Sequence, residues 1–430
     1  MPVEGDPTLA AVLAALLSPA HDPAELQVAG KCVLLRADLN VPLDADGRVD
    51  DDNRVTAALP TISLLVEKGA RVVVASHLGR PDLGKRPEDR TALSLAPVAE
   101  MLAALLPTFV GLAPDCVGPE VAARVAALKD GQVLLLENTR FHAGDTDNDD
   151  AFAGQLAELA DVFVNDAFGV VHRAQASVTG VALKVPQRCP GLLVRKEVAA
   201  LGRHLSEPAR PFGVVIGGAK VADKLGVIDT LIDKADMVLI GGKMAFTFLA
   251  ATGVQFHESQ VEESLFEKCL AMLKKGEALG VRILLPVDVL VADRLEQSAQ
   301  THISELSTTC CTKTDPCVGC CVFGADIGPK TIALFQAALK ECRTIFWNGP
   351  VGKFEVPLFS SGTNAIAETL REVTSSGAIT VIGGGDSVNA LRSLGYEKEV
   401  SHVSTGGGAS LELIEGKSMP GLQALVDGAI

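Results

Sequence analysis

Basic side chains follow several of the strands predicted in the first half of the chain. The tails "ADLN", "HLGR", "NTRFH" and "DAFGVVHR" come directly after short apolar runs. The polar side chains that they supply are Asp38, Asn40, His77, Arg80, Arg140, His172 and Arg173. Each guanidinium group can hold a carboxylate or a phosphate through two parallel hydrogen bonds. Several arginines at one sheet edge therefore indicate a compact ligand with more than one negative charge.

Glycine-rich turns follow the strands predicted in the second half. The tails there are "GGAK", "GGKM", "VD", "NGPVG", "GGGD" and "TGGG". Because glycine has no Cβ, the backbone can approach a ligand closely, and N–H groups at a helix N-terminus can hold phosphates. We therefore expect this half to bind a polyphosphate, with the small acid opposite.

Structural explanations compete with these interpretations. A single strand–glycine turn is usually only a tight βα connection, and a lone arginine usually belongs to a surface ion pair. The repetition of both patterns argues against those explanations. Asp386 could cap the helix after its glycines or hold Mg²⁺ beside phosphates, and we favour the metal. Arg54, in "DDNRVTAAL", would by itself be interpreted as a solvated residue in the first turn of a helix.

The elements that position these residues are predicted from the alternation of apolar runs with Ala- and Leu-rich helical stretches, which indicates βαβ units. Strands are predicted at 32–36, 71–76, 133–137, 161–165, 212–216, 237–240, 282–287, 344–347, 378–382 and 402–404. Ligands of parallel sheets bind beyond the carboxyl ends of the strands. We expect an α/β fold with two doubly wound, Rossmann-like parallel-sheet domains, joined by a hinge helix within 191–211.

Length and charge limit the function classes. A chain of 430 residues is too long for one ordinary core, so two domains are expected. The formal net charge of -15 argues against nucleic-acid binding. No apolar run approaches the roughly 20 residues of a membrane span. No basic residue precedes the apolar opening "PTLAAVLAALLSPA", so we expect a short helix or the remnant of a processed leader rather than a secretory signal.

The cysteines fall into two groups. Of the 10 cysteines, five cluster in "CCTKTDPCVGCC", namely Cys310, Cys311, Cys317, Cys320 and Cys321. A single CxxC pair is weak evidence for zinc, because a structural site normally needs a second pair. A regulatory disulfide and a loop of exposed thiols remain alternatives. The other cysteines are expected to be buried, reduced thiols.

Eight motifs, in order along the chain, resemble those of the phosphoglycerate kinase family. They are "RADLNVP", "SHLGRP", "ENTRFH", "DAFGVVHRA", "GGAKVADK", "FWNGPVGKFE", "GGGDS" and "HVSTGGGASLELIEGK". The match runs from about residue 30 to the end of the chain. The resemblance implies reversible, Mg²⁺-dependent phosphoryl transfer between ATP and the carboxylate of 3-phosphoglycerate, giving ADP and 1,3-bisphosphoglycerate after domain closure.

The same resemblance implies roles for individual residues. The phosphoglycerate would be bound by Asp38, Asn40, Arg54, His77, Arg80, Arg140 and Arg173. The nucleotide would be bound by Gly217, Gly218, Lys220, Lys224, Gly241, Gly242, Gly324, Asn348, Glu355, Gly384, Gly385, Asp386 and Ser387. Asp386 would hold the metal. Gly407 and Gly408 would lie at the transferring phosphoryl group.

The implied chemistry needs alignment and charge neutralisation more than proton transfer. A carboxylate nucleophile is already ionised at neutral pH, so no general base is required. Catalysis would rest on Arg54, Lys220, Gly385 and Gly408. The N-terminal domain, which binds 3-phosphoglycerate, would comprise 1–200, with the tail 412–430 packed back on it. The C-terminal nucleotide-binding domain would comprise 201–411.

Three positions depart from the family pattern, and other functions must be weighed. Lys243 and Ala325 stand at the expected adenine pocket, which leaves the nucleotide preference open, and Gln175 replaces a usual histidine.

A dinucleotide dehydrogenase is disfavoured because no GxGxxG is followed by an acid about 20 residues later. A non-catalytic binding protein is disfavoured because every expected ligand group is present. The expected protein is a monomer with small-molecule substrates, in the cytoplasm or, alternatively, in a plastid or another organelle.

Overall fold

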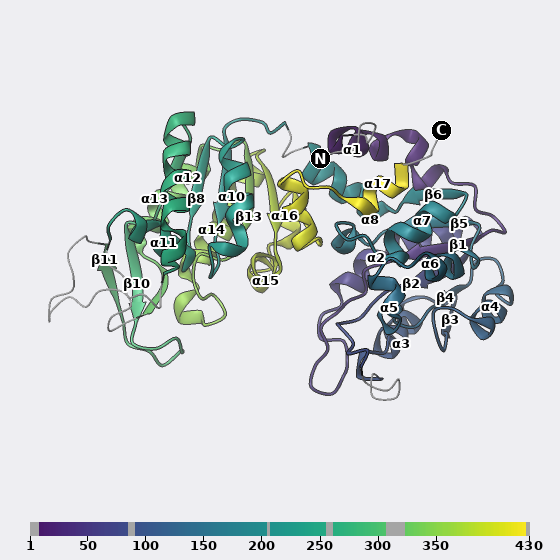
Figure 1. Ribbon diagram of the computed structural model, residues 1–430. Coiled ribbons are helices and arrows are strands. Elements are labelled where there is room, and N and C mark those ends of the chain that lie inside the picture. The colour runs from purple at the N-terminus through teal and green to yellow at the C-terminus, as the bar shows by residue number, and fades with distance from the viewer. Residues whose placement is uncertain (1–7, 85–90, 204–206, 255–260, 307–322, 427–430) are drawn as a thin grey trace. The chain divides into compact units, whose positions relative to one another are not determined.

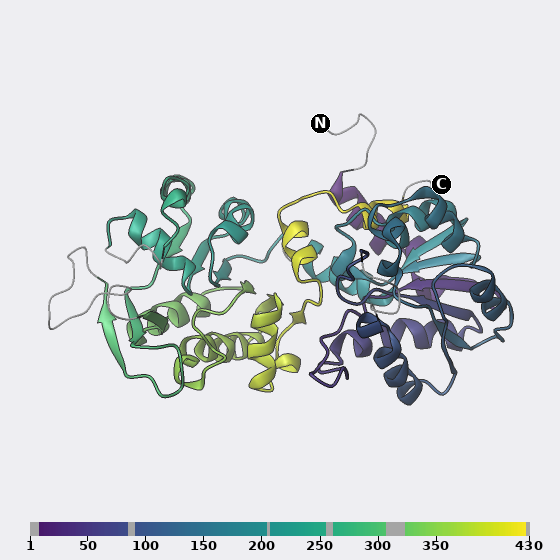
Figure 2. The same ribbon diagram turned by 60° about the horizontal axis from the view of Figure 1, so that its bottom comes forward.

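The computed structural model describes residues 8–84, 91–203, 207–254, 261–306 and 323–426, and the chain divides into two compact units (Figure 1; Figure 2). Unit 1 comprises Met1–Gly202 together with Gly416–Ile430, and unit 2 comprises Arg203–Glu415. Each unit contains a 6-stranded parallel sheet with flanking helices. The predicted α/β fold with two parallel-sheet domains is confirmed.

The sheet of unit 1 has the strand order β3-β4-β2-β1-β5-β6, and its paired strands are parallel. Its strands are β1 (Cys32–Arg36), β2 (Arg71–Ala75), β3 (Phe109–Leu112), β4 (Val133–Leu135), β5 (Val162–Asn165) and β6 (Gln187–Pro190). The chain builds from β1 to one side and then continues with β5 on the other side. The switch point between β1 and β5 is where a doubly wound sheet binds its ligand.

Helices cover the sheet of unit 1. They are α1 (Leu9–Leu17), α2 (Asn53–Glu67), α3 (Ala96–Leu105), α4 (Pro119–Ala126), α5 (Ala143–Thr146), α6 (Asp150–Ala157), α7 (Val181–Lys184), α8 (Leu192–Glu197) and α17 (Pro420–Val426). The last helix, α17, packs against the first, α1, and also contacts β6. Segments from both ends of the described chain therefore lie side by side in unit 1 (Figure 1).

The core of unit 1 shows why its sequence folds in this way. All five residues of β1, "CVLLR", are buried, as expected for a parallel strand that is covered on both faces. Helix α2 buries Val55, Ala58, Ile62 and Leu65, and their spacing of three and four residues forms one apolar face. These side chains share a core cluster with alternate residues of β1. Truncating Ile62 to alanine would cost roughly 2–5 kcal/mol because a cavity would remain.

The sheet of unit 2 has the order β15-β14-β13-β7-β8-β9 and is also parallel. Its strands are β7 (Phe212–Ile216), β8 (Met237–Ile240), β9 (Arg282–Leu284), β13 (Thr344–Asn348), β14 (Ile379–Gly383) and β15 (His402–Val403). The helices are α10 (Leu225–Ile232), α11 (Met244–Ala251), α12 (Phe266–Leu279), α13 (Pro329–Lys340), α14 (Ser361–Ser375), α15 (Gly385–Ser393) and α16 (Gly408–Ile414). Here the switch point lies between β7 and β13.

Unit 2 also contains an antiparallel sheet that was not predicted. Its order is β11-β10-β12, and its strands are β10 (Asp288–Ala292), β11 (Thr301–Glu305) and β12 (Phe323–Ile327). The predicted strand 282–287 was too long, because β9 ends at Leu284. Asp288 was also wrongly placed in the tail of that strand. It begins β10, where its buried carboxylate accepts hydrogen bonds from the N–H groups of Lys330 and Thr331 in the first turn of α13.

Two edge strands of unit 1, β3 and β6, were also missed, because "FVGL" is short and "QRCP" is largely polar. Within 191–211, α8 is followed by a π-helical segment, Val198–Arg203. Helix α8 begins where Asp166, directly after β5, accepts hydrogen bonds from the N–H groups of Leu193 and Val194 at 2.8 and 3.1 Å.

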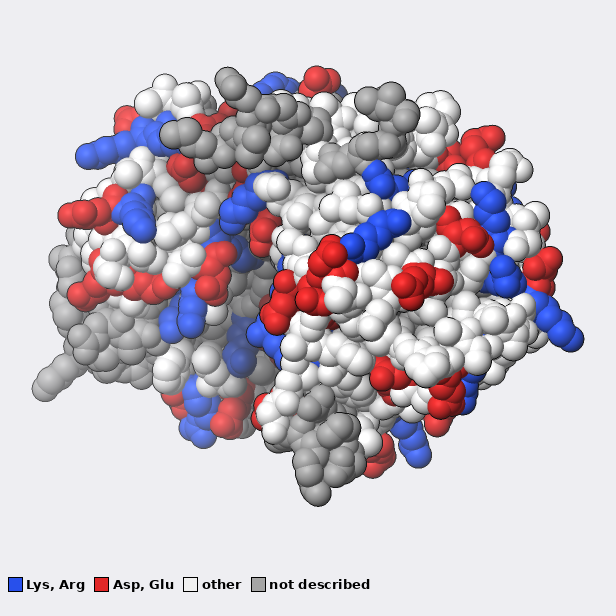
Figure 3. Space-filling model, turned by 45° about the vertical axis from the view of Figure 1, so that its right-hand side comes forward, with Lys and Arg blue, Asp and Glu red and all other residues white. Residues whose placement is uncertain are grey.

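No helix within the described ranges is long and apolar enough to cross a membrane. On the face shown in Figure 3, acidic and basic side chains are interspersed, and the drawn side chains form no broad basic surface.

Candidate functional site

A buried arginine organises the carboxyl end of β1. The Arg36 side chain is fully buried, and its Nε donates to Ser177 Oγ at 3.0 Å. Its Nη2 lies 3.1 Å from Nδ1 of His77, which follows β2. Since a guanidinium group can only donate, Nδ1 must accept, and the proton of the imidazole then sits on Nε2. Burial and the charge of Arg36 hold the pKa of His77 well below its usual value, so the ring is neutral.

Asp38 and Arg54 form an ion pair across the same edge. The Nη1 of Arg54, in the first turn of α2, contacts Oδ2 of Asp38. Burial alone would raise the pKa of Asp38, but the charges of Arg54 and Arg36 outweigh it and lower the pKa. The Arg54 side chain remains 35% exposed, so part of its guanidinium group faces solvent. It can therefore reach a ligand while Asp38 fixes its position.

Arg140 completes a cluster of positive charge. It is 7% exposed, and its Nη1 donates to the carbonyl of Gly79 at 2.8 Å. Its Nε has no hydrogen-bond partner among the described residues. Burial, followed by the charges of Arg36 and Arg173, lowers the pKa of Arg140 to about 10. A pKa lowered by neighbouring guanidinium groups means that these like charges lie close together, which is the environment of an anion site.

The remaining predicted residues of unit 1 lie in the loops that follow its strands. The side-chain oxygen of Asn40 accepts from the N–H of Gly79 at 2.7 Å, which ties the loop after β1 to the loop after β2. Arg80, the next residue, is exposed, and so is Arg173, whose Nε donates to His172 at 3.1 Å. The structure therefore brings together the tails of several strands in unit 1 through direct bonds or through their charges.

Unit 2 has a hollow of about 370 Å³ beyond the ends of its strands. Five of the predicted nucleotide residues line it, namely Gly218, Gly242, Gly324, Glu355 and Asp386. Lys243 and Ala325, two of the three positions that depart from the family pattern, line it as well. The remaining lining is largely apolar and includes Phe246, Val289, Leu295 and Phe323. An apolar hollow that is bordered by glycine turns and a few charges fits a nucleoside with its phosphates.

Asn348, the last residue of β13, lies at the switch point beside Lys224. The Nζ of Lys224 donates to the carbonyl of Asn348 at 3.0 Å and contacts its side-chain oxygen. The Asn348 side chain is 2% exposed, yet its Nδ2 has no partner among the described residues. Burial lowers the pKa of Lys224 to about 8. A buried donor without an acceptor and an ammonium group with a lowered pKa both favour an incoming anion.

The glycines near this site differ in whether, and for what structural reason, a side chain is excluded. A Cβ on Gly217 would lie 2.1 Å from the carbonyl oxygen of Pro350, and one on Gly241 would lie 2.5 Å from Val351 Cγ1, so tight packing explains both. At Gly384, which caps α15, φ is +89°. A Cβ on Gly385, Gly407 or Gly408 would meet nothing within 4 Å. Among the described residues no contact excludes a side chain at Gly385 or Gly408, whereas the φ of +52° at Gly407 disfavours any residue other than glycine.

Helix α15 presents its first turn to the hollow. Gly384 is the N-cap, and no side chain caps the helix, so the cap that we considered for Asp386 does not form. The Asp386 carboxylate is exposed and lines the hollow. Ser387 is buried, and its hydroxyl accepts from the N–H of Gly349 at 2.6 Å. Its hydroxyl oxygen therefore holds the loop after β13, while its O–H and its backbone N–H can still donate.

Some residues were missed and others cannot be placed. No functional role was predicted for Arg36. An arginine at the end of an apolar strand nevertheless indicates a buried charge, and buried charges are often functional. The wall formed by Val289 and Phe323 was missed along with the antiparallel sheet. Lys220 is exposed beyond β7. The cluster Cys310–Cys321 lies outside the described residues, and the five described cysteines, Cys32, Cys116, Cys189, Cys269 and Cys342, are buried free thiols.

Comparison with known proteins gives consistent matches. The family model described as phosphoglycerate kinase matches residues 24–417. A phosphoglycerate kinase of a Synechococcus strain is 47% identical over 420 residues, which cover 96% of this chain and 98% of that protein. The phosphoglycerate kinase of Chlorobium phaeobacteroides is 45% identical over 404 residues, which cover 94% of this chain and 98% of that protein.

Solved structures match equally broadly. The phosphoglycerate kinase structure from Coxiella burnetii superposes with a TM-score of 0.81 at 37% identity, and covers 95% of this chain and 99% of that chain. The structure from Pyrococcus horikoshii gives a TM-score of 0.76 at 31% identity, with 93% and 97% covered.

Proposed function

The chain belongs to the phosphoglycerate kinase family, and from this premise we propose that it transfers a phosphoryl group reversibly between ATP and 3-phosphoglycerate in a Mg²⁺-dependent reaction. The forward products are ADP and 1,3-bisphosphoglycerate. The observation that carries the proposal is the charge cluster of unit 1, in which Arg140 is buried near Arg36 and Arg173, so that burial and then their charges lower its pKa.

We propose that this cluster binds 3-phosphoglycerate. The acid carries a carboxylate and a phosphate, and bidentate guanidinium contacts suit both groups. Arg140 and Arg173, with Arg80 beside them, would neutralise the phosphate. Asn40 and the Nε2–H of His77 would donate to neutral oxygens or to the carboxylate. Asp38 would accept from the hydroxyl group and hold Arg54 in place.

We propose that the hollow of unit 2 binds the nucleotide. The apolar wall would cover the base, and Ala325 and Lys243 would border it. The phosphates would then reach the first turn of α15, where the N–H groups of Gly385, Asp386 and Ser387 have no acceptor within the helix. The Nδ2 of Asn348 and the ammonium groups of Lys224 and Lys220 would add donors there. Glu355 would accept from the ribose.

The residues at this edge also fit a magnesium ion. The Asp386 carboxylate is exposed, is not used as a cap and borders the hollow, and an oxygen ligand beside phosphates suits Mg²⁺. When bound, the ion would neutralise charge on the β- and γ-phosphates. Asp386 would hold the ion through its carboxylate.

The chain's residues would align and neutralise the reactants during transfer. A carboxylate oxygen of 3-phosphoglycerate forms the new bond to the γ-phosphorus, and the bond to the bridging oxygen of ADP breaks. The negative charge that spreads over the transferring group would be met by Arg54 from unit 1 and by Lys220 with the N–H groups near Gly385 and Gly408 from unit 2. No proton has to move, because the nucleophile is already ionised.

The two ligands are assigned to different units, and they must come into contact for the transfer. We propose that the units close on each other, with the segment 191–211 as the hinge, so that the reactants meet and water is excluded. Small-angle scattering should show compaction only when both substrates are present. An unchanged radius of gyration in the ternary complex would contradict closure.

A coupled assay tests the reaction itself. With ATP, Mg²⁺ and 3-phosphoglycerate, ADP should form only when the acid is present, and removal of Mg²⁺ by a chelator should stop the reaction. A binding protein without catalysis would release no ADP, and a dehydrogenase would need a nicotinamide cofactor.

We further propose that the enzyme acts as a monomer in the cytoplasm, in glycolysis, gluconeogenesis or carbon fixation.

A further inference from the structure

Three side chains that could bind a metal lie together in unit 1, and none of them was assigned to 3-phosphoglycerate. They are Asp115, Cys116 and His142, and one ligand atom of each lies within 4.8 Å of the others. Asp115 and Cys116 lie in the loop between β3 and α4, whereas His142 lies between the turn Thr139–Phe141 and α5. The topology therefore brings two separate loops to one point.

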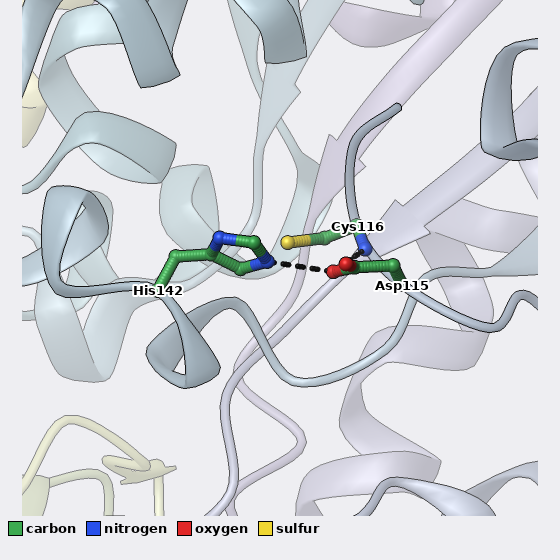
Figure 4. A group of neighbouring side chains, drawn as sticks. All are labelled: Asp115, Cys116 and His142. Carbon is green, nitrogen blue, oxygen red and sulfur yellow. Dashed lines mark hydrogen bonds and ion pairs between the residues drawn. The ribbon is translucent and has the colours of Figure 1, made fainter. Parts of the chain in front are cut away.

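The three side chains face one another. Nε2 of His142 lies 2.6 Å from Oδ1 of Asp115. Figure 4 shows the sulfur of Cys116 and the carboxylate of Asp115 on the side of the imidazole ring that carries Nε2. The ring plane is fixed because His142 stacks on Phe152, with centroids 5.1 Å apart and an angle of 25°. The N–H of Cys116 donates to Asp115 Oδ1 at 2.7 Å, which orients the carboxylate.

The three side chains differ in their exposure to solvent. Cys116 is fully buried, while the side chains of His142 and Asp115 are 32% and 47% exposed. His142 borders a hollow of about 690 Å³, which is also lined by Asp147 and Asp149. A cation in this hollow would meet the imidazole of His142 beside two further carboxylates, although neither Asp115 nor Cys116 lines the hollow itself.

The donor set selects among metals. A thiolate, an imidazole nitrogen and a carboxylate oxygen are the usual ligands of Zn²⁺, whereas Mg²⁺ and Ca²⁺ prefer oxygen alone. In tetrahedral zinc sites the ligand atoms stand roughly 3–4 Å apart, so these side chains would have to shift by only about 1 Å. Water would complete the fourth position at the exposed side.

We propose that Asp115, Cys116 and His142 form a Zn²⁺ site that joins the loop after β3 to the loop before α5. The competing explanation is a hydrogen-bonded cluster without metal, in which the carboxylate accepts from both neighbours. Binding of the ion would stabilise unit 1 by mass action. This site does not depend on the proposed kinase activity.

Cobalt and zinc alone can serve as probes in the full chain. The five cysteines of 310–321 are first changed to serine, so that they cannot compete, and the metal is removed with a chelator. Co²⁺ should then bind with a stoichiometry of one and give a near-ultraviolet thiolate-to-metal band, which Zn²⁺ should abolish by displacement. Zn²⁺ should also raise the unfolding temperature.

Three variants and one control decide the outcome. Cys116→Ser should remove the thiolate band. Asp115→Asn and His142→Phe, which keeps the stacking on Phe152, should weaken binding at least ~10–100-fold. Cys342→Ser, a buried thiol of unit 2 whose sulfur contacts Met237 Sδ and the carbonyl of Ala338, should change nothing. The absence of a thiolate band in the five-serine background, or affinity that survives both Asp115→Asn and His142→Phe, would overturn the proposal, even if Cys116→Ser does not fold.

Discussion

Nη2 of Arg36 lies 3.1 Å from Nδ1 of His77, and this contact fixes the tautomer of a histidine at the candidate acid site. Because the guanidinium group donates, the imidazole must accept at Nδ1 and carry its proton on Nε2. His77 is thus a neutral hydrogen-bond donor, and Arg36 positions it from within the core.

The titration of the His77 imidazole provides the first prediction. Burial and Arg36 lower the pKa of His77 well below its usual value. Nitrogen NMR of histidine-labelled protein should show His77 as the Nε2–H tautomer, with no titration from pH 6 upward. An imidazole that gains a proton near its ordinary pKa would show that the Arg36 contact does not persist in solution.

The second prediction concerns Arg54, which faces solvent while paired with Asp38. Arg54→Ala should lower kcat by about 10²–10³-fold, as the loss of one preorganised donor to the transition state does elsewhere. The affinity for ATP should change little. Arg48→Ala, an exposed arginine whose side chain is 79% accessible, is the matched control and should leave kcat unchanged. Near wild-type turnover in Arg54→Ala would remove Arg54 from the mechanism.

The third prediction uses a glycine that no internal contact requires. A Cβ at Gly385 would meet nothing within 4 Å, so Gly385→Ala should fold normally. Its unfolding temperature should be unchanged or slightly raised, since alanine reduces the entropy of the unfolded chain. The methyl group would nevertheless occupy the space proposed for phosphate, and KM for ATP should rise at least about tenfold, by roughly the 1.4 kcal/mol that one lost charged contact represents. Gly154→Ala in α6, which also meets nothing, should leave KM unchanged.

The fourth prediction concerns Asp166, which anchors the start of α8. Burial raises the pKa of Asp166 from 3.8 to about 6. Between those pH values the folded chain holds a proton that the unfolded chain has released, so unfolding becomes easier as pH rises through this window. The loss amounts to roughly 3 kcal/mol once the pH exceeds the folded pKa.

Asp166→Asn tests this sign. Both N–H donors bond to Oδ1, so the amide can keep these two hydrogen bonds while it cannot ionise. The difference in unfolding temperature between the variant and the wild type should grow from pH 4 to pH 7 in scanning calorimetry. Asp130→Asn, at an exposed position of the same unit, should give a constant difference. A constant difference for Asp166→Asn as well would show that this carboxylate does not titrate abnormally.

The sequence predicted most of the two parallel sheets because their central strands are continuous apolar runs, as in β1 and β7, where every residue is buried. The antiparallel sheet was missed for a physical reason. Strand β11, "THISE", buries only Ser304, so its pattern carries no signal of burial. Its pairing with β10 depends on contacts that periodicity does not reveal.

The candidate site was predictable where chemistry follows a strand, as for His77, Arg140 and Asn348. The site was not predictable for a residue that is buried in the core and positions another side chain. Arg36 was assigned to a strand and given no further role, because a sequence does not show that its side chain turns toward His77. The sequence also could not show that Gly217 and Gly385 are glycines for different reasons. At Gly217 a Cβ would clash with the backbone of Pro350, whereas at Gly385 a Cβ would meet nothing within 4 Å.

The central claim is that the acid binds to unit 1 and the nucleotide to unit 2, and a crossed calorimetric titration tests it most directly. 3-Phosphoglycerate and MgADP are titrated separately into full-length wild type, Arg173→Ala and Gly385→Ala. Arg173→Ala should lose at least about tenfold in affinity for the acid and keep its affinity for MgADP, and Gly385→Ala should do the reverse. Equal loss of both ligands in either variant, or the opposite pattern, would contradict the account.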